Sequence, residues 1–389
     1  MNQCLHCGEC LSRCVYLRLD RAEAAAEMAR LDAGEPTPHL DKSCVSCAAC
    51  DLFCPHDAQP YQRILQLLYA KYLQHGLPER ARYFMPTAPE NFRTYVQDRL
   101  PADEAALVET WDTATPAGDV LYPGCNLIIA AYLTHSGVFD NLTIAGGLKD
   151  CCGEMYYRFG MFDLVRRFAE RHTRYYADKP IDRMVFVCPA GLNMFANVLP
   201  EKFGAHFDFP MVFFTDYLHD LLDAGRLTVT NPLAGKIVMH DSCHGRLLGP
   251  ALMDSVRRLL ERLGLTIVEA EHSREDGFCC GIAAGAPRQS LVDLSTAVLR
   301  AGWEYERSAG ESVATYCTGC YLTLATPPGA TGLGKPVHHV LDLVAEAIGK
   351  PVADRLGKRV RTLLKGVVQN AVPKYLSRDR FWMSGGPKE

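Results

Sequence analysis

The chain has 389 residues, 48% of them hydrophobic, which is enough to bury large cores in two or three globular domains. A formal net charge of -4 and a pI near 6.4 argue against a generic nucleic-acid binder. No window reaches the roughly 18 to 20 continuous apolar residues of a spanning helix, and the N-terminus opens into cysteines without the apolar core of a signal peptide. We therefore expect a soluble, cytoplasmic chain.

The chain contains 17 cysteines, and every one of them falls in a cluster. The reducing cytosol keeps thiols from forming a disulfide framework. The clusters are therefore better explained as metal ligands.

The first two clusters have the same spacing, C-x2-C-x2-C-x3-C, and the second is followed by Pro55. This is the bacterial ferredoxin pattern, in which the fourth cysteine of each run binds the cluster of the other run. We therefore predict two cubane 4Fe-4S clusters, one held by Cys4, Cys7, Cys10 and Cys54, the other by Cys44, Cys47, Cys50 and Cys14. The alternative is a pair of zinc sites, but zinc has no use for two crossed four-cysteine runs.

Residues 21–31 are rich in Ala, Glu and Met, which predicts a helix between the two runs and a helical ferredoxin domain over residues 1–60. Apolar residues at helical spacing continue from Ile64 to Leu73, and prolines at 86 and 89 interrupt the pattern. We expect a helical connector over residues 61–117, packed on the ferredoxin domain. A partner-docking surface is the open alternative.

The next two segments, residues 118–230 and 231–348, share one layout of short apolar strands that run into cysteines. The expected strands are 120–122, 142–144 and 184–187 in the first segment, and 236–239, 265–268 and 313–316 in the second. Helices are expected at 162–176 and 253–263. The pattern predicts an internal repeat of α/β units. Ligands of open α/β sheets bind beyond the carboxyl ends of the strands, where these cysteines fall.

The second repeat carries five cysteines, Cys243, Cys279, Cys280, Cys317 and Cys320. Five exceed the four ligands of a zinc ion, and an adjacent cysteine pair is able to hold two metal atoms of one cluster. Among the residues beside Cys243, His244 is a candidate for proton delivery or for hydrogen bonding to a bound cluster.

The first repeat carries four cysteines, Cys125, Cys151, Cys152 and Cys188. Gly191 stands where the second repeat has Cys320, and the first gap is 25 residues instead of 35. A cubane, a zinc ion, an altered cluster and a metal-free lining all remain open for this set.

Two ferredoxin runs followed by two repeats with Cys-Cys-Gly resemble the D-type subunit of heterodisulfide reductase over nearly the whole chain. They are also similar to the C-type subunit of anaerobic glycerol-3-phosphate dehydrogenase and to subunits of sulfate-reducer respiratory complexes. The resemblance implies a noncubane 4Fe-4S cluster on the five cysteines of the second repeat, at which a disulfide is reductively cleaved. It also implies a partner, a membrane cytochrome b or other quinone-reactive subunit, or a dehydrogenase subunit.

Cleaving a disulfide takes two electrons, whereas each cubane passes one at a time. We expect an iron-sulfur oxidoreductase subunit, heterodisulfide reductase-like, that reduces or forms a disulfide or related sulfur substrate in anaerobic respiration. It would lie at the inner face of the membrane through its partners and bind no nucleic acid. The alternative is an electron relay between a dehydrogenase and the quinone pool, and a zinc scaffold is a third possibility.

The C-terminal segment, residues 349–389, combines an apolar helical stripe with a strongly basic composition. The stripe consists of Leu356, Val360, Leu363, Leu364, Val367 and Val368. Residues 355–380 hold eight Lys or Arg and one acidic residue, a local charge of +7. Such a helix either docks on an anionic membrane or a membrane subunit, or covers the core.

Overall fold

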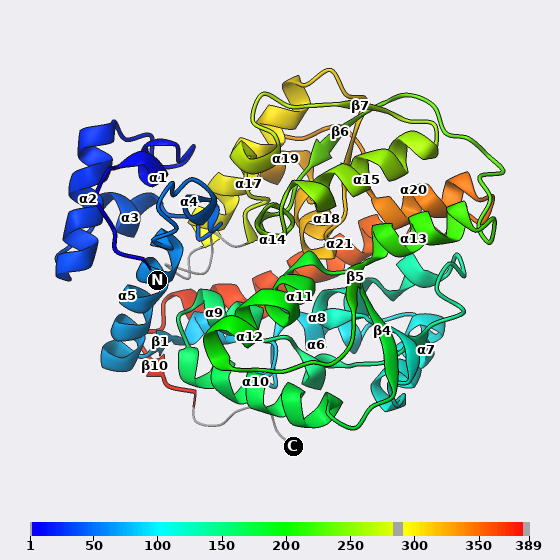
Figure 1. The fold of residues 1–389 in the computed structure, drawn as a ribbon, viewed down its shortest axis with the longest axis horizontal. Coiled ribbons are helices and arrows are strands. Elements are labelled where there is room, and N and C mark those ends of the chain that lie inside the picture. Colours follow the sequence, from blue (N-terminus) through cyan, green and yellow to red (C-terminus); the bar gives the residue numbers. More distant parts are fainter. Residues whose placement is uncertain (1, 283–290, 384–389) are drawn as a thin grey trace.

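The computed structural model describes residues 2–282 and 291–383, so the last part of the predicted C-terminal segment, residues 384–389, lies outside the described residues. Figure 1 shows a helical N-terminal part beside two α/β units, one containing β4 and the other β6 and β7. The predicted α/β class with an N-terminal helical ferredoxin domain is confirmed.

Short helices surround the two ferredoxin runs. They are α1 (Glu9–Ser12), α2 (Arg21–Ala33), α3 (Pro38–Ser43), α4 (Ala49–Leu52) and α5 (Pro60–His75). Helix α2 is the predicted insert, and Asp20 starts it in a capping box with Glu23. Its buried Met28 packs in one apolar cluster with Phe53 and Ile64, which holds the insert against the cysteine runs.

The segment that follows the ferredoxin runs is helical. It continues from α5 through the 3-10 helix η1 (Glu79–Phe84), α6 (Phe92–Gln97) and α7 (Ala102–Thr113). Strand β1 (Leu77–Pro78) pairs antiparallel with β10 (Arg380–Phe381), so the connector also anchors the end of the described chain.

The first α/β unit is built on a parallel sheet of order β3-β2-β4-β5. Its strands are β2 (Gly118–Tyr122), β3 (Thr143–Ile144), β4 (Ile181–Phe186) and β5 (Met211–Phe213). Its helices are α8 (Gly124–Leu127), α9 (Glu154–Arg158), α10 (Phe162–Tyr176), α11 (Pro189–Asn193), α12 (Leu199–Phe203) and α13 (Phe214–Asp223).

The second unit has the corresponding order, β7-β6-β8-β9, and is also parallel. Its strands are β6 (Lys236–His240), β7 (Thr266–Val268), β8 (Ser312–Thr315) and β9 (Val337–His339). Its helices are α14 (Cys243–Leu247), α15 (Pro250–Arg262), α17 (Leu291–Arg307), α18 (Thr318–Leu324), α19 (Pro328–Thr331) and α20 (Val340–Ala347). Strands β2 and β6, and β4 and β8, therefore hold equivalent places, and their carboxyl ends carry equivalent cysteines.

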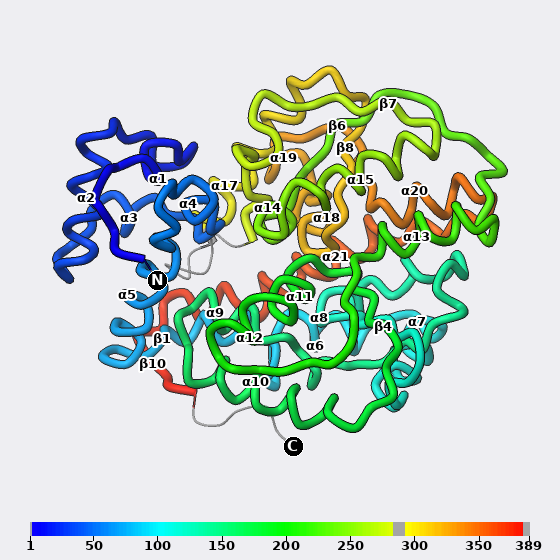
Figure 2. The backbone as a smooth tube through the Cα atoms, viewed as in Figure 1, coloured from blue at the N-terminus to red at the C-terminus, as the bar shows by residue number. Residues whose placement is uncertain are grey.

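Helix α21 (Leu356–Gly366) continues into η7 (Val367–Ala371) and η8 (Val372–Tyr375) and packs against α6 and α18. Figure 2 shows this segment running between the two α/β units. The predicted stripe faces inward, because Val360 is buried and Leu363, Leu364 and Val367 pack on the same apolar cluster as Phe92. Val368 is the exception and is exposed.

A buried ion pair fixes α21 to the connector. Glu104 on α7 is fully buried, and its Oε1 accepts from Arg359 Nη2 at 2.7 Å and from Arg355 Nη1 at 2.8 Å. Arg359 is 5% exposed and also donates to the carbonyl of Ile129. The pair satisfies two charges that would be costly to bury alone.

Glu104→Gln should therefore lower the free energy of unfolding by about 3–5 kcal/mol, because it leaves Arg359 buried without a counter-charge. The matched control is Asp103→Asn, which removes the exposed partner of Arg355 and should leave the unfolding midpoint nearly unchanged. Anaerobic urea unfolding followed by circular dichroism gives both values. Equal losses in the two variants would contradict this account.

Candidate metal centres

The two ferredoxin runs have the same local backbone conformation. His6 and Gly8 in the first run, and Ser46 and Ala48 in the second, all have positive φ, at 49°, 76°, 56° and 63°. At Gly8 a side chain would also collide with the carbonyl of Arg21, 2.2 Å from an added Cβ. These turns direct amides at sulfur, as when Ser46 N donates to Cys44 Sγ at 3.4 Å.

The electrostatic interactions among the eight thiols agree with two groups of four in which the fourth cysteine of each run is exchanged, and Cys50 also interacts with Cys10 of the other group. Cys10 lies within electrostatic reach of Cys4, Cys7 and Cys54. In the other group Cys14 interacts with Cys47, and Cys50 with Cys44 and Cys47. These are the predicted ligand sets, and ligation itself remains a prediction.

The cysteines of both α/β units face one cavity of about 60 Å³. Eight of them line it, namely Cys125, Cys151, Cys152 and Cys188 of the first unit and Cys243, Cys280, Cys317 and Cys320 of the second. Cys279 is 1% exposed and hydrogen bonds with Cys243 behind this wall. The predicted five-cysteine set is thus brought together.

The two sets meet at Cys188 and Cys317, which share a hydrogen bond. Hydrogen bonds from Cys188 and Cys320 hold the pKa of Cys317 well below its usual range, and those from Cys279 and Cys320 also lower the pKa of Cys280. The thiolate form is therefore favoured at the centre of the cavity wall, where the units touch.

His244 lies on the cavity wall in a buried polar network. Its Nδ1 is 3.2 Å from the Asn193 amide nitrogen, and its Nε2 is 2.8 Å from Glu154 Oε1. Despite burial, which raises the pKa of Glu154, the charges of Arg158 and His244 hold that pKa at about 2. The wall therefore carries a fixed carboxylate, with a histidine beside Cys243.

Arg158 ties this network to the ferredoxin domain. It is 4% exposed, and its Nη2 donates to Cys243 Sγ at 3.1 Å. Its Nη1 donates to the carbonyl of Ser46, between Cys44 and Cys47. One guanidinium thus touches a cysteine of the second unit and the backbone of the second ferredoxin run.

A second arginine faces the other end of the cavity. Arg93 is 2% exposed, and its Nε donates to Asn126 Oδ1 at 3.2 Å and its Nη1 to the carbonyl of Phe84 at 3.2 Å. It also hydrogen bonds with Cys125. Among the described residues Arg93 forms no ion pair, and its polar partners are the oxygens of Asn126 and Phe84 and the thiol of Cys125.

Tyr16 and Arg246 lie between the ferredoxin domain and the five-cysteine set. The hydroxyl of Tyr16, two residues after Cys14, accepts from Cys279 N at 2.7 Å. Arg246 is 2% exposed, donates from Nη1 to the carbonyl of Gly277 at 2.6 Å, and lies within electrostatic reach of Cys47 and Cys243. The two cysteine groups are therefore neighbours in the fold.

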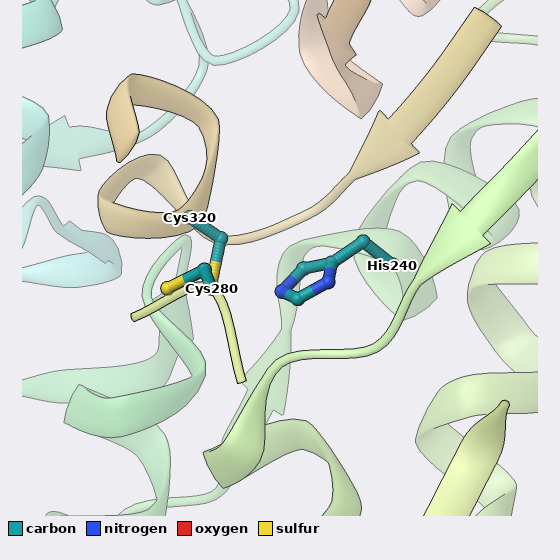
Figure 3. Close-up of side chains that lie close together, drawn as sticks. All are labelled: His240, Cys280 and Cys320. Carbon is teal, nitrogen blue, oxygen red and sulfur yellow. The ribbon is translucent and has the colours of Figure 1, made fainter. Parts of the chain in front are cut away.

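His240 is a further buried polar residue beside the five-cysteine set. Figure 3 shows its ring, at the end of β6, pointing toward Cys280 and Cys320. A ring nitrogen and the two sulfurs lie within 4.8 Å of one another. Burial lowers the pKa of His240 to about 4, so the imidazole is neutral at neutral pH.

The side chains fit iron-sulfur clusters in two respects. Four thiols are the ligand set of a cubane, and burial raises the pKa of Cys10 to about 12 and that of Cys14 to about 11, so these thiols stay protonated until a bound metal displaces the proton. Several buried polar atoms without a partner among the described residues also lie beside the five-cysteine set, namely His240 Nε2, Arg246 Nε and Nη2, and Thr318 Oγ1. Cluster sulfurs are acceptors that would satisfy such donors.

The sequence pattern identified the cysteines and His244, but not the arginines, Tyr16 or His240 as site residues. Arg158 lies four residues after Glu154 on α9, so helical spacing indicates the pairing of these two side chains but not the contact of Arg158 with Cys243. Arg93 lies in the connector, where no local sequence signal links it to Cys125.

Two family models match the chain. A 4Fe-4S dicluster domain matches residues 3–59, and a cysteine-rich domain of the CCG family matches residues 237–325. These matches confirm the predicted domain types at both places. The first α/β unit has the same sheet topology, and the CCG match covers the second unit alone.

The curated relatives carry related names. The chain is 26% identical to the EtfAB:quinone oxidoreductase of Syntrophomonas wolfei over 68% of this chain and 38% of that protein. It is 26% identical to the D-type subunit of the dihydromethanophenazine:CoB--CoM heterodisulfide reductase of Methanosarcina barkeri, over 79% of this chain and 77% of that one. It is 32% identical to a probable iron-sulfur-binding oxidoreductase of Bacillus subtilis over 40% of this chain and 21% of the relative.

The match spans less than half of the first of these relatives and most of the second. The predicted resemblance to the D-type subunit of heterodisulfide reductase is confirmed. In the part of the chain that the structure describes, no helix has the length and apolarity needed to cross a bilayer.

The crossed arrangement of the ferredoxin thiols leads to a specific prediction. Cys54→Ser should damage the cluster held by Cys4, Cys7 and Cys10, and spare the cluster formed by the rest of its own run. Cys14→Ser is the matched control and should produce the reciprocal loss. EPR of the two reduced variants distinguishes the clusters, and loss of the same signal in both would refute crossed ligation.

Proposed function

We propose that this chain, which joins a 4Fe-4S dicluster domain to a CCG cysteine-rich domain, is the electron-delivering and disulfide-reducing subunit of a membrane-linked oxidoreductase. Its substrate would be a disulfide or related sulfur compound. In the reducing direction, one S–S bond takes up two electrons and two protons and yields two thiols. The same site would form the disulfide in the reverse direction.

The shared cavity is the observation that supports this function best. A relay needs short distances between clusters, but it does not need cysteines from two units around one enclosed space. Both buried guanidiniums, Arg93 and Arg158, stand at this space and would stabilise thiolate charge on a substrate. His244, hydrogen-bonded to Glu154, is placed to give a proton to a departing thiolate.

The contact between the domains supports delivery of electrons to the cavity. The cubane nearer the second unit would be the one held by Cys14, Cys44, Cys47 and Cys50. Tyr16, two residues after Cys14, is hydrogen-bonded to Cys279, and Arg246 lies within electrostatic reach of both Cys47 and Cys243. The five-cysteine set would hold a further cluster, and the clusters would supply one-electron chemistry when bound. The electrons would come from a partner, either a membrane cytochrome b-type or quinone-reactive subunit or a dehydrogenase.

The second candidate function is an electron relay without bond cleavage, between a dehydrogenase and the quinone pool. The similarity to a protein named EtfAB:quinone oxidoreductase favours this candidate. In a relay the cavity would hold a cluster that no substrate reaches. The EPR spectrum of that cluster would then not change when thiols are added.

The proposal predicts three four-iron clusters, about 12 irons per chain, with the unusual one at the second cysteine set. Cys320→Ser should abolish the signal of that cluster. The control variant in the first unit is Cys125→Ser, which should leave the signal largely intact. Cys125 contacts Cys151 and Arg93, whereas Cys188 is less suitable as a control because it is hydrogen-bonded to Cys317 of the second set. Iron analysis and EPR of anaerobic protein test this, and about 16 irons with equal loss in both variants would contradict it.

We also propose that the C-terminal segment contacts an anionic membrane surface, through its exposed side rather than its apolar stripe. The exposed side carries residues spaced three or four apart, which we call the exposed C-terminal stripe. It consists of Lys358, Arg361, Lys365, Val368, Val372 and Leu376. Val368 is 63% exposed and Leu376 92% exposed. Basic residues followed by exposed apolar ones match the charge of anionic headgroups and the apolar layer beneath them.

Replacing Val368, Val372 and Leu376 together by Ser should weaken binding to phosphatidylglycerol-containing vesicles at least tenfold, at roughly 1 kcal/mol or more per buried side chain. These side chains are exposed, so the fold should survive, whereas deleting α21 would expose the core. Val292→Ser, an exposed site on α17, is the control. Vesicle co-sedimentation measures binding, and equal binding of the triple variant and the wild type would disprove the membrane contact.

A further inference from the structure

The two α/β units differ at one pair of equivalent positions beside their cysteines. Tyr122 ends β2 three residues before Cys125, and His240 ends β6 three residues before Cys243. Likewise Gly191 corresponds to Cys320, since Gly191 lies three residues after Cys188, which follows β4, and Cys320 lies three residues after Cys317, which follows β8. The unit with the fifth cysteine therefore has histidine where the other has tyrosine.

The first unit shows why the pairs go together. A Cβ built on Gly191 would lie 3.2 Å from the Tyr122 ring and 3.3 Å from the Phe186 ring. The tyrosine ring thus occupies the space into which a fifth cysteine would project. Its hydroxyl donates a hydrogen bond to the carbonyl of Asp150. In the second unit the smaller imidazole leaves room for Cys320 and presents a nitrogen to it.

The hydrogen bonds of His240 identify which nitrogen carries a proton toward the cysteines. Nδ1 lies 2.6 Å from the hydroxyl of Tyr305, whose side chain is buried. Among the described residues Nδ1 of His240 is the hydrogen-bond acceptor available to this hydroxyl. When the tyrosine donates to Nδ1, the ring proton resides on Nε2. Nε2 is buried and has no hydrogen-bond partner among the described residues.

We propose that His240 is a positioning residue that donates an Nε2–H···S hydrogen bond to the sulfurs held at Cys280 and Cys320. The inference rests on the proposed function, because it assumes a cluster at the five-cysteine set. A hydrogen bond to sulfur stabilises the reduced, more negative state and so raises the reduction potential. Tyr305 fixes the donor, because its own proton is committed to the bond to Nδ1.

The test is the midpoint potential of the signal from the second cysteine set, measured on the full-length, cluster-loaded protein. His240→Leu should shift that potential to a more negative value. His240→Gln, whose amide N–H reaches a similar position, should restore most of the wild-type potential. His339→Leu is the matched control, because His339 is equally buried, has an unpartnered Nε2 and lies within electrostatic reach of Cys317, but has no nitrogen grouped with the sulfurs of Cys280 and Cys320.

A wild-type potential in His240→Leu, at wild-type iron content, would overturn the inference, as would an equal shift in His339→Leu. If His240→Leu loses the cluster, wild-type protein with 15N-labelled histidine decides the question. A weak nitrogen coupling to the signal, absent in His240→Gln, would support the hydrogen bond. No coupling, or one as strong as that of a directly coordinated imidazole, would overturn it.

A wild-type chain with only about eight irons would instead refute the proposed function, and this inference with it, because the two ferredoxin clusters account for that number. Iron content therefore separates failure of the proposed function from failure of the hydrogen bond.

Discussion

Buried thiols ionise only where hydrogen bonds or positive charge replace the solvation they have lost, and the site depends on this constraint. Cys243, Cys279 and Cys280 are almost inaccessible to water, and the cations nearest them, Arg158 and Arg246, are themselves buried. Arg158 is paired with Glu154 and also donates to the carbonyl of Ser46 and to Cys243, whereas Arg246 has two side-chain nitrogens without a partner among the described residues. A bound iron-sulfur cluster would replace the protons of the thiols and offer acceptors to Arg246.

The same sheet topology supports two different cysteine environments. In each unit, parallel strands carry their cysteines to one edge, and the edges face each other across a single cavity. The tyrosine and glycine of the first unit exclude a fifth sulfur, and the histidine and cysteine of the second admit it. Asymmetry of this kind would let one half bind the reactive cluster and the other shape the space in front of it.

Much of this could be predicted from sequence, because cysteine spacing and strand length are local properties. Helix 162–176 was predicted with its observed bounds, and the strands leading to cysteines were found within three residues. Strands β5 and β9 were not predicted, since each has three residues and runs directly into a helix, so the apolar run looks continuous. Arg93, Arg158 and Tyr16 join the site through tertiary contacts between distant segments, which no spacing rule reveals.

The proposal that sulfur chemistry occurs in the shared cavity is tested most directly by EPR of the oxidised protein titrated with a monothiol, unlabelled or enriched in 33S. The account predicts a saturable new paramagnetic signal, at most one per chain, that broadens with 33S because the added sulfur binds at the cluster. A spectrum that no thiol changes, from protein with intact clusters that still passes electrons to a quinone, would contradict it and establish the relay.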